Sequence, residues 1–329
     1  MKKKRVLSGI RATGRLHLGN YLGAVKGMLA LQDDPGFETL YMIADLHTMT
    51  TPYDRGNLRS AAREVVLDYL ACGLDPDRSV LFIQSEVAEL HTQLAFYLST
   101  AVSVARMQHL PTYKDKVTQY PKDVTMALLN YPVLMAADIL IYKASKVPVG
   151  IDQEPHLEIA REIARKMNEL YGMDFPEPTR FATESGYIPS LLGEGKMSKS
   201  IEGSYISLTD DLPAIAQRLA GAPTDSGQGK KVPTEGGVAN LFTLVELFEG
   251  MEKRETFEKA YVGTGVRYQD LKKELAEAIS TTLKPIQKRR RELEVNASSV
   301  DQVIQEGSQK ARAIAKVTVE EVRRAMGLS

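Results

Sequence analysis

The chain has 329 residues, of which 43% are hydrophobic and 26% are charged, proportions typical of a folded globular protein. Its 42 basic and 42 acidic residues cancel at neutral pH, so a nucleic-acid partner would have to bind a local basic patch. The single cysteine excludes an intrachain disulfide framework, and without a signal peptide or a run of about 18 apolar residues we expect a cytoplasmic protein with no membrane association.

Short runs rich in Val, Ile, Leu and Tyr recur through the first half of the chain and predict buried parallel strands. They are RVLSGI at 5–10, TLYMIAD at 39–45, SVLFIQS at 79–85 and KVPVG at 146–150. Helical patterns separate them, in LGNYLGAVKGMLALQ from residue 18, NLRSAAREVVLDYLACG ending at Gly73, and PHLEIAREIARKMNELYG from Pro155 to Gly172. This alternation of strands and helices predicts an α/β fold with a mostly parallel sheet.

Helical periodicity replaces the strand pattern from about residue 208. It is found at 211–221, 238–250, 268–293 and 300–327, and a Gly-, Pro- and Lys-rich segment at 221–237 predicts a mobile loop. We therefore predict two domains, residues 1–207 with a helical insertion at about 90–140, and an all-helical domain at 208–329. The last helix is free to pack back on the first domain.

The stretch TGRLHLGNYLGA at 13–24 lies where the first predicted strand gives way to a helix. A helix that begins near Gly19 directs its free N–H groups and positive dipole end at a ligand above the sheet, which favours an anion. His17 and Asn20 are three residues apart, so both can donate to phosphate oxygens. Taken alone, the motif also fits a chance match in which His17 merely caps the helix.

A second candidate phosphate site is the loop GEGKMSKS at 193–200. It places Lys196 and Lys199 among flexible Gly and Ser residues, so that two cations could close over a polyphosphate and open again. A solvated surface loop is the alternative. The patterns GxxxxGK[ST] and GxGxxG are both absent, which disfavours a P-loop enzyme and a standard dinucleotide dehydrogenase.

Asp138 lies in an otherwise apolar helical stretch, where an unpaired carboxylate would be costly. An arginine or a backbone amide is one candidate partner. A ligand indole is another, because an indole only donates and an acceptor-only carboxylate selects it over phenylalanine. Met135, Val147 and Val149 would line such a pocket or else belong to the core. If the carboxylate mainly serves a ligand, Asp138 should contribute little to the stability of the free protein.

HLGN at 17–20 and KMSKS at 196–200 together resemble the two signature motifs of class I aminoacyl-tRNA synthetases. The run YPVLMAADILIYKASKVPVGIDQEPHLE at 131–158 is similar to that of bacterial tryptophanyl-tRNA synthetases, and weaker similarity extends over nearly the whole chain. The sequence departs from that family's pattern at three places, Leu7, Arg11–Ala12 and Ile151. The resemblance implies a Rossmann-like catalytic domain and an anticodon-binding helical domain.

The resemblance also implies roles for individual residues. The residues expected to act on the phosphates are His17, Asn20, Lys196 and Lys199. Those expected at ATP are Arg11, Ala12, Thr13, Gly19, Asn20, Gly150, Ile151, Asp152, Ile188, Lys196, Met197, Ser198, Lys199 and Ser200. Those expected at tryptophan are Asp138, Leu7, Gly9, His47, Tyr131, Met135, Val147, Val149 and Gln153.

The implied reaction activates tryptophan with ATP and transfers it to tRNA(Trp), with Mg²⁺ held mainly by the ATP phosphates and no resident metal site. The implied partners are L-tryptophan, ATP, tRNA(Trp) and a second copy in a homodimer, which the apolar segment 96–107 could join. The basic run LKPIQKRRREL offers cations for RNA backbone contact, namely Lys284, Lys288, Arg289, Arg290 and Arg291. A tyrosine-specific enzyme of the same fold and a non-catalytic or auxiliary relative are the alternatives.

Overall fold

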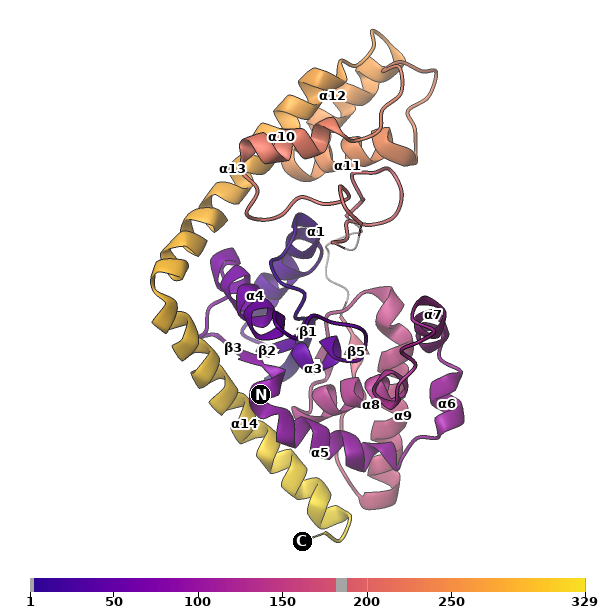
Figure 1. Ribbon diagram of the computed structural model, residues 1–329, viewed down its shortest axis with the longest axis vertical. Helices are drawn as coiled ribbons and strands as arrows, with labels where there is room; N and C mark the ends of the chain where they lie inside the picture. Colours follow the sequence, from indigo (N-terminus) through magenta and orange to yellow (C-terminus); the bar gives the residue numbers. More distant parts are fainter. Residues whose placement is uncertain (1–2, 182–187, 200, 329) are drawn as a thin grey trace.

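A computed structural model describes residues 3–181, 188–199 and 201–328, and its centre is a five-stranded parallel sheet (Figure 1). The strands are β1 (Lys4–Arg11), β2 (Phe37–Ala44), β3 (Ser79–Ile83), β4 (Lys146–Val147) and β5 (Thr179–Arg180). Their order is β3-β2-β1-β4-β5, and every pair is parallel. The predicted α/β class with a parallel, Rossmann-like sheet is confirmed.

The order of the strands creates a switch point beside β1. The chain runs outward from β1 through β2 to β3, and then returns to β4 on the other side of β1. β1 pairs with β2 along its whole length but with β4 only at Val6 and Lys146. In open α/β sheets such a reversal leaves a crevice at the carboxyl ends of the strands, where ligands bind. The order of the strands therefore predicts a ligand site beyond the ends of β1 and β4.

The helices around the sheet begin and end at recognisable residues. They are α1 (Leu18–Asn20), α2 (Lys26–Asp33), α3 (Asp45–Thr48), α4 (Leu58–Cys72), α5 (Ala88–Ser99), α6 (Val104–Gln108), α7 (Pro111–Gln119), α8 (Met126–Ile141) and α9 (Glu154–Tyr171). Gly73 and Gly172 cap α4 and α9 with φ of 113° and 65°, the left-handed region that glycine adopts at low cost. Pro155 lies in the first turn of α9, so the predicted limits of both helices are confirmed.

Five helices follow the sheet within the described residues; four match the predicted helical segments, whereas the one at 251–262 was not predicted. They are α10 (Leu212–Ala220), α11 (Gly236–Glu249), α12 (Met251–Val262), α13 (Tyr268–Val295) and α14 (Ala297–Ala325). α13 begins beside α10 and α11 and ends beside α4, and it buries Leu275, Ile279, Leu283 and Ile286 along one side. α13 and α14 run along one side of the sheet, from the α10–α12 group to the C-terminus (Figure 1).

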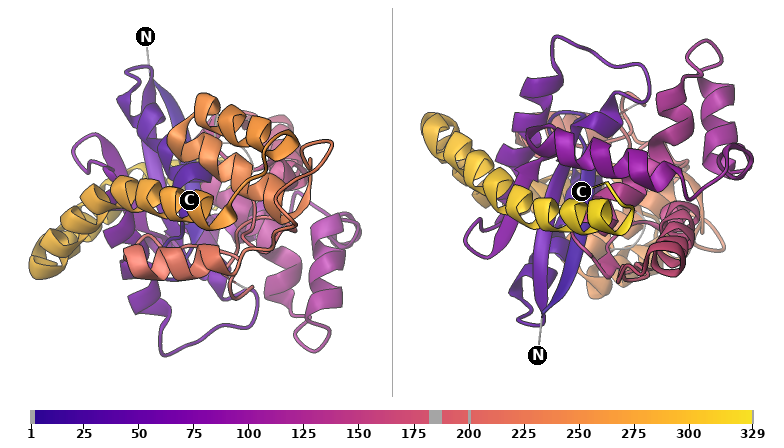
Figure 2. Two further views of the ribbon diagram at one scale, coloured as in Figure 1. Left: turned by 90° about the horizontal axis from the view of Figure 1, so that it is seen from above. Right: turned by 90° about the horizontal axis from the view of Figure 1, so that it is seen from below.

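The last helix packs against the first half of the chain. α14 contacts β3, the end strand of the sheet, and α5 (Figure 2). Gly307 permits this approach, because a Cβ at that position would collide with the carbonyl oxygen of Leu81 in β3. Residues after 207 thus also cover the sheet, and the division of the chain into domains at that point remains a prediction. Among the described residues, no helix combines the length and apolar character needed to cross a bilayer.

Candidate active site

A cavity of about 380 Å³ lies at the carboxyl ends of β1 and β4. Small-molecule pockets span roughly 300 to 1,000 Å³, so the cavity can hold an amino acid. All nine residues predicted at tryptophan line it, namely Leu7, Gly9, His47, Tyr131, Met135, Asp138, Val147, Val149 and Gln153. The structure brings these residues together, whereas their role in binding remains a prediction.

Asp138 projects from the last turn of α8 and is only 2% exposed. Its Oδ1 accepts hydrogen bonds from Gln84 Nε2 at 2.7 Å and His91 Nδ1 at 2.6 Å, and its Oδ2 accepts one from His47 Nε2 at 2.7 Å. Burial raises the pKa of Asp138, but the hydrogen bonds from His47 and His91 outweigh burial and hold the pKa below its usual value. The carboxylate is therefore ionised at neutral pH.

These contacts argue against the expectation that Asp138 matters little to the free protein. Gln84 and His91 are completely buried, and both would lose their acceptor if the carboxylate were removed. The partners are not the expected arginine or backbone amide. They are His47 of α3, Gln84 directly after β3, and His91 of α5. Neither Gln84 nor His91 was identified from the sequence, because each lies more than 40 residues from Asp138.

His156 at the start of α9 organises a second wall of the cavity. Its Nδ1 donates to Gln153 Oε1 at 3.1 Å, so its Nε2 accepts from the hydroxyls of Tyr131 at 2.7 Å and Thr112 at 2.8 Å. Burial, with a contribution from His47, lowers the pKa of His156 to about 4, which keeps the ring neutral. His156 was not among the predicted site residues. Its spacing with the buried Ile159 and Ile163 indicates an inward-facing polar residue.

Arg11 and Lys116 bring positive charge to the same cavity. Arg11 Nη2 donates to Thr51 Oγ1 at 2.7 Å and to the Thr48 carbonyl at 3.3 Å. Burial lowers the pKa of both basic groups, and the charge of Arg11 further lowers the pKa of Lys116. Two like charges facing one cavity favour an anionic ligand. Lys116 belongs to the largely exposed α7, and no sequence pattern distinguishes it from other surface lysines.

The HLGN motif supplies the N-cap, His17, and all three residues of the short helix α1. His17 is 7% exposed, and its backbone N–H donates to Asn20 Oδ1 at 3.1 Å. A Cβ on Gly19 would lie 2.9 Å from His17 Cε1 and 3.0 Å from Met197 Cβ, so only glycine fits there. Burial lowers the pKa of His17 to about 4, with a contribution from Lys199. Within the described residues His17 Nδ1 is buried and has no hydrogen-bond partner, which is unusual for a buried polar atom.

The KMSKS motif lies directly against HLGN. Met197 lies against Gly19, and backbone hydrogen bonds join HLGN and the residue before it to the segment that follows KMSKS, from Leu18 N to Ile206 O at 2.8 Å and from Leu208 N to Leu16 O at 3.2 Å. Lys199 Nζ donates to the Thr13 carbonyl at 3.2 Å. The structure thus brings both predicted phosphate-binding motifs together.

The individual residues of the motif differ in exposure. Lys196 is exposed, whereas Met197 is buried beside Gly19 and its backbone N–H donates to the Ile188 carbonyl at 3.1 Å. Ile188 is only 5% exposed, so its side chain belongs to the core and only its backbone can contact ATP. Ser198 is held through its backbone to Ser204 Oγ. Ser200, also predicted at ATP, lies outside the described residues.

The other residues predicted at ATP follow β1 and β4. Ala12 is buried and donates its N–H to Thr48 Oγ1 at 3.1 Å. In the turn before α9, Gln153 Nε2 donates to Asp152 Oδ2 at 2.7 Å, and a Cβ on Gly150 would collide with Asp152 Oδ1. Ile151 is 69% exposed.

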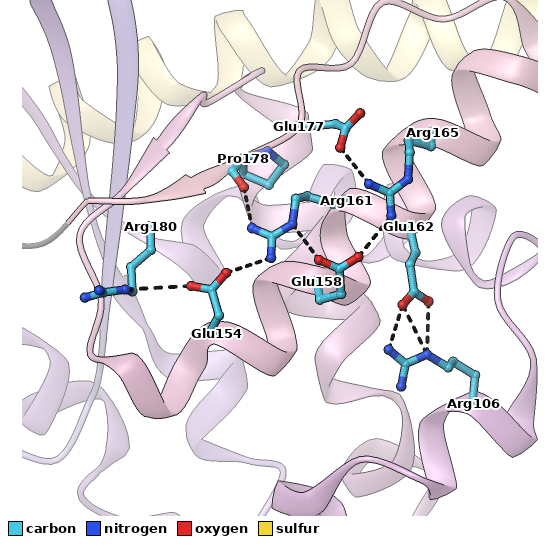
Figure 3. A network of polar contacts seen from close by, with 9 residues as sticks. All are labelled: Arg106, Glu154, Glu158, Arg161, Glu162, Arg165, Glu177, Pro178 and Arg180. Atoms are coloured by element: carbon cyan, nitrogen blue, oxygen red, sulfur yellow. Dashed lines mark hydrogen bonds and ion pairs between the residues drawn. The ribbon is translucent and has the colours of Figure 1, made fainter.

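A network of ion pairs fastens this turn to β5 (Figure 3). Glu154, the first residue of α9, pairs with Arg161 at 2.7 Å and with Arg180 of β5 at 3.7 Å. Arg161 also donates to Glu158 at 2.8 Å and to the Pro178 carbonyl at 3.0 Å. These contacts therefore tie the start of α9, which directly follows the turn, to β5 and to the residue just before it.

The basic run in α13 divides into exposed and buried residues. Four of its cations are exposed, Lys284, Lys288, Arg289 and Arg291. Arg290 is 3% exposed and pairs with Asp68 and Glu64 of α4. The expectation that Arg290 contacts RNA is therefore wrong, because its guanidinium is enclosed and already neutralised.

Residues 1–284 match the family described as tRNA synthetases class I (W and Y), and the chain therefore belongs to this family. Two curated relatives are tryptophan–tRNA ligases. The protein of Porphyromonas gingivalis is 40% identical over 98% of each chain, and that of Helicobacter pylori is 41% identical over the full length of both.

Solved structures of aminoacyl-tRNA synthetases are also similar to this chain. The crystal structure of tryptophanyl-tRNA synthetase from Campylobacter jejuni, complexed with ADP and tryptophan, has a TM-score of 0.86 and 31% identity, covering 98% of this chain and 100% of that chain. Tyrosyl-tRNA synthetase from Aeropyrum pernix has a TM-score of 0.66 at 19% identity, covering 93% of this chain and 90% of that chain. The second similarity shows the fold alone.

Proposed function

We propose that the chain is a tryptophan–tRNA ligase, which activates tryptophan with ATP and transfers it to tRNA(Trp). The observation that supports this most is the composition of the cavity. A buried carboxylate, Asp138, and apolar side chains such as Met135 and Val147 surround a space that also receives Arg11. An apolar ring with one donor and an anionic tail matches that combination.

We propose that Asp138 accepts a hydrogen bond from the indole N–H of the substrate. A carboxylate offers about four acceptor positions, and three are occupied by protein donors. Among the described residues, Oδ2 accepts only from His47, so it has room for one more donor. Tyrosine presents a hydroxyl that both donates and accepts, and phenylalanine presents no donor. A site built around this single acceptor therefore favours tryptophan.

The activation step requires no protein nucleophile. The carboxylate of tryptophan is ionised at neutral pH, and one of its oxygens attacks the α-phosphorus of ATP. A new P–O bond forms as the bond to pyrophosphate breaks, giving tryptophanyl-adenylate and pyrophosphate. The protein contributes placement and charge stabilisation. We assign His17, Asn20, Lys196 and Lys199 to the phosphates, with Mg²⁺ held mainly by ATP.

The second step transfers tryptophan to the tRNA. A ribose hydroxyl at the tRNA terminus attacks the adenylate carbonyl and releases AMP. We propose that the α10–α13 region binds the anticodon part of tRNA(Trp), and that the exposed cations of α13 contact the phosphate backbone of the RNA. They are Lys284, Lys288, Arg289 and Arg291. These reactants are cytoplasmic, and we place the protein in that compartment.

We further propose that the chain acts as a homodimer. The segment 96–107 exposes Phe96 by 70% and Val104 by 59%, and Met126 at the start of α8 is 73% exposed. Large apolar side chains of this kind are typical of the centre of a subunit interface. Light scattering on the wild type and on Phe96→Asp would test this, since the substitution should shift a dimer towards monomer.

The test of the function is amino-acid-dependent exchange of pyrophosphate into ATP. Tryptophan and tyrosine are assayed in parallel, and exchange with tryptophan alone is expected. Exchange with tyrosine alone would identify a tyrosine-specific enzyme. Absence of exchange with every amino acid would identify a non-catalytic relative.

A further inference from the structure

A ring of ion pairs connects α13 with the loop that precedes His17. Asp68 of α4 is fully buried, and its Oδ2 accepts the backbone N–H of Leu16 at 2.5 Å. Its Oδ1 accepts from Arg290 of α13, which also donates to Glu64. Glu64 in turn accepts from Arg15 Nε at 2.8 Å. Two consecutive residues, Arg15 and Leu16, are thus tied to two carboxylates that share one guanidinium.

Leu16 is held through both of its backbone polar groups. The Leu16 carbonyl accepts from Leu208 N at 3.2 Å, just beyond the KMSKS loop, while its N–H is bound by Asp68. The Leu16 side chain is 1% exposed. His17 follows directly, so the direction of its backbone into the HLGN turn is set by how Leu16 is held.

The chemistry of the ring indicates a role in positioning. A buried ion pair is usually no more stabilising than apolar residues of the same volume, because both charges lose their hydration. What it supplies is direction, since a carboxylate accepts only at defined positions and a guanidinium donates through a planar fork. All three guanidinium nitrogens of Arg290 donate hydrogen bonds, because Nε also donates to Glu294 at 3.0 Å. An apolar residue could fill the space but could not orient the Leu16 amide.

We propose that Asp68 and Arg290 are positioning residues for the activation step, which orient the HLGN loop towards the ATP phosphates by fixing Leu16 from α4 and α13. The proposal rests on the proposed function, because it concerns the same phosphate site. It assigns to α13 a part in the reaction that is separate from RNA contact.

The test compares Arg290→Met with the matched control Lys273→Met. Both substitutions remove one positive charge from α13, but Lys273 is exposed and outside the ring. Tryptophan-dependent exchange gives kcat and the KM values, and the fluorescence of bound tryptophan gives its Kd. For Arg290→Met we expect kcat to fall at least tenfold, with the Kd for tryptophan within twofold of wild type. The control should keep both within twofold.

Two further variants separate positioning from stability. Asp68→Asn/Arg290→Met removes the charge pair together and should recover much of the melting temperature without recovering kcat. Arg290→Lys keeps the charge but loses the fork, so it should fold and still show a reduced kcat; it replaces Arg290→Met if that variant does not fold. A wild-type kcat in the double variant or in Arg290→Lys would overturn the proposal. Absence of exchange in the wild-type enzyme would instead refute the proposed function.

Discussion

Replacing Asp138 with alanine should destabilise the protein even without a ligand. The carboxylate accepts from Gln84, His91 and His47, and the first two are completely buried. A buried donor left without its acceptor costs about 1–3 kcal/mol. Two such donors give a loss of about 2–6 kcal/mol in the free energy of unfolding. His47 is excluded from this sum, because it lines the cavity and water can replace the lost acceptor.

Chemical denaturation followed by circular dichroism measures this loss, which is a large part of the roughly 5–15 kcal/mol typical of folded proteins. Asp138→Asn retains the volume and one acceptor oxygen, so its loss should be smaller. Asp123→Ala removes an exposed carboxylate and serves as the control. If Asp138→Ala unfolds at the denaturant concentration of the wild type, the hydrogen bonds to Gln84 and His91 do not stabilise the fold and this reasoning is refuted.

The same variants report on the ligand. The chain contains no tryptophan, so excitation near the red edge of the indole band detects only added tryptophan. Its emission should shift to the blue on binding, as Met and Val side chains replace water. Asp138→Asn should weaken binding by about 1–2 kcal/mol, because a charge-assisted hydrogen bond becomes a neutral one. An unchanged titration would mean that the indole N–H does not bind Asp138.

Three further predictions concern the phosphate site and the buried histidines. Lys199→Ala should slow activation at least tenfold while the Kd for tryptophan stays constant; normal exchange with weakened tryptophan binding would contradict the assignment. The free energy of unfolding should fall as the pH drops from 6.5 towards 4, because His17 and His156 have a pKa of about 4 in the folded protein and about 6.5 in the unfolded chain. At pH 5 the loss is at most about 2 kcal/mol for each histidine. An unchanged denaturation midpoint between pH 7 and pH 5 would disprove this prediction. Gly19→Ala should raise the KM for ATP without unfolding the protein, because the added methyl group would displace His17 or Met197; steady-state kinetics with an unaltered KM would refute this.

The sheet could be predicted from the sequence where a strand is long and apolar, as for β1, β2 and β3. The run 146–150 was expected to be a strand throughout, but β4 ends at Val147. Pro148 has no N–H to donate to a neighbouring strand, which explains the early end. β5 has only two residues and α12 is polar on most sides, so neither presents the periodicity on which such predictions depend.

The cavity residues could be predicted because they belong to contiguous motifs, whereas their partners could not. Gln84 and His91 reach Asp138 only through the packing of η2, the 3-10 turn at Gln84–Val87, and α5 against α8. Arg290 was misinterpreted for a different reason. In a run of basic residues it continues the buried stripe of Leu283 and Ile286 at helical spacing, so the pattern that indicates burial was present in the sequence.

The packing of α14 on β3 sets an order for folding during synthesis. Domains form as the chain leaves the ribosome, N-terminal parts first. Gly307 of α14 lies 226 positions after Leu81, the residue of β3 that it contacts. β3 is therefore not covered by α14 while most of the chain is being made. An uncovered end strand is a template for pairing with other chains. A chain that stops before residue 297 keeps that strand exposed, so the contact of α14 with β3 also protects the sheet from pairing with other chains.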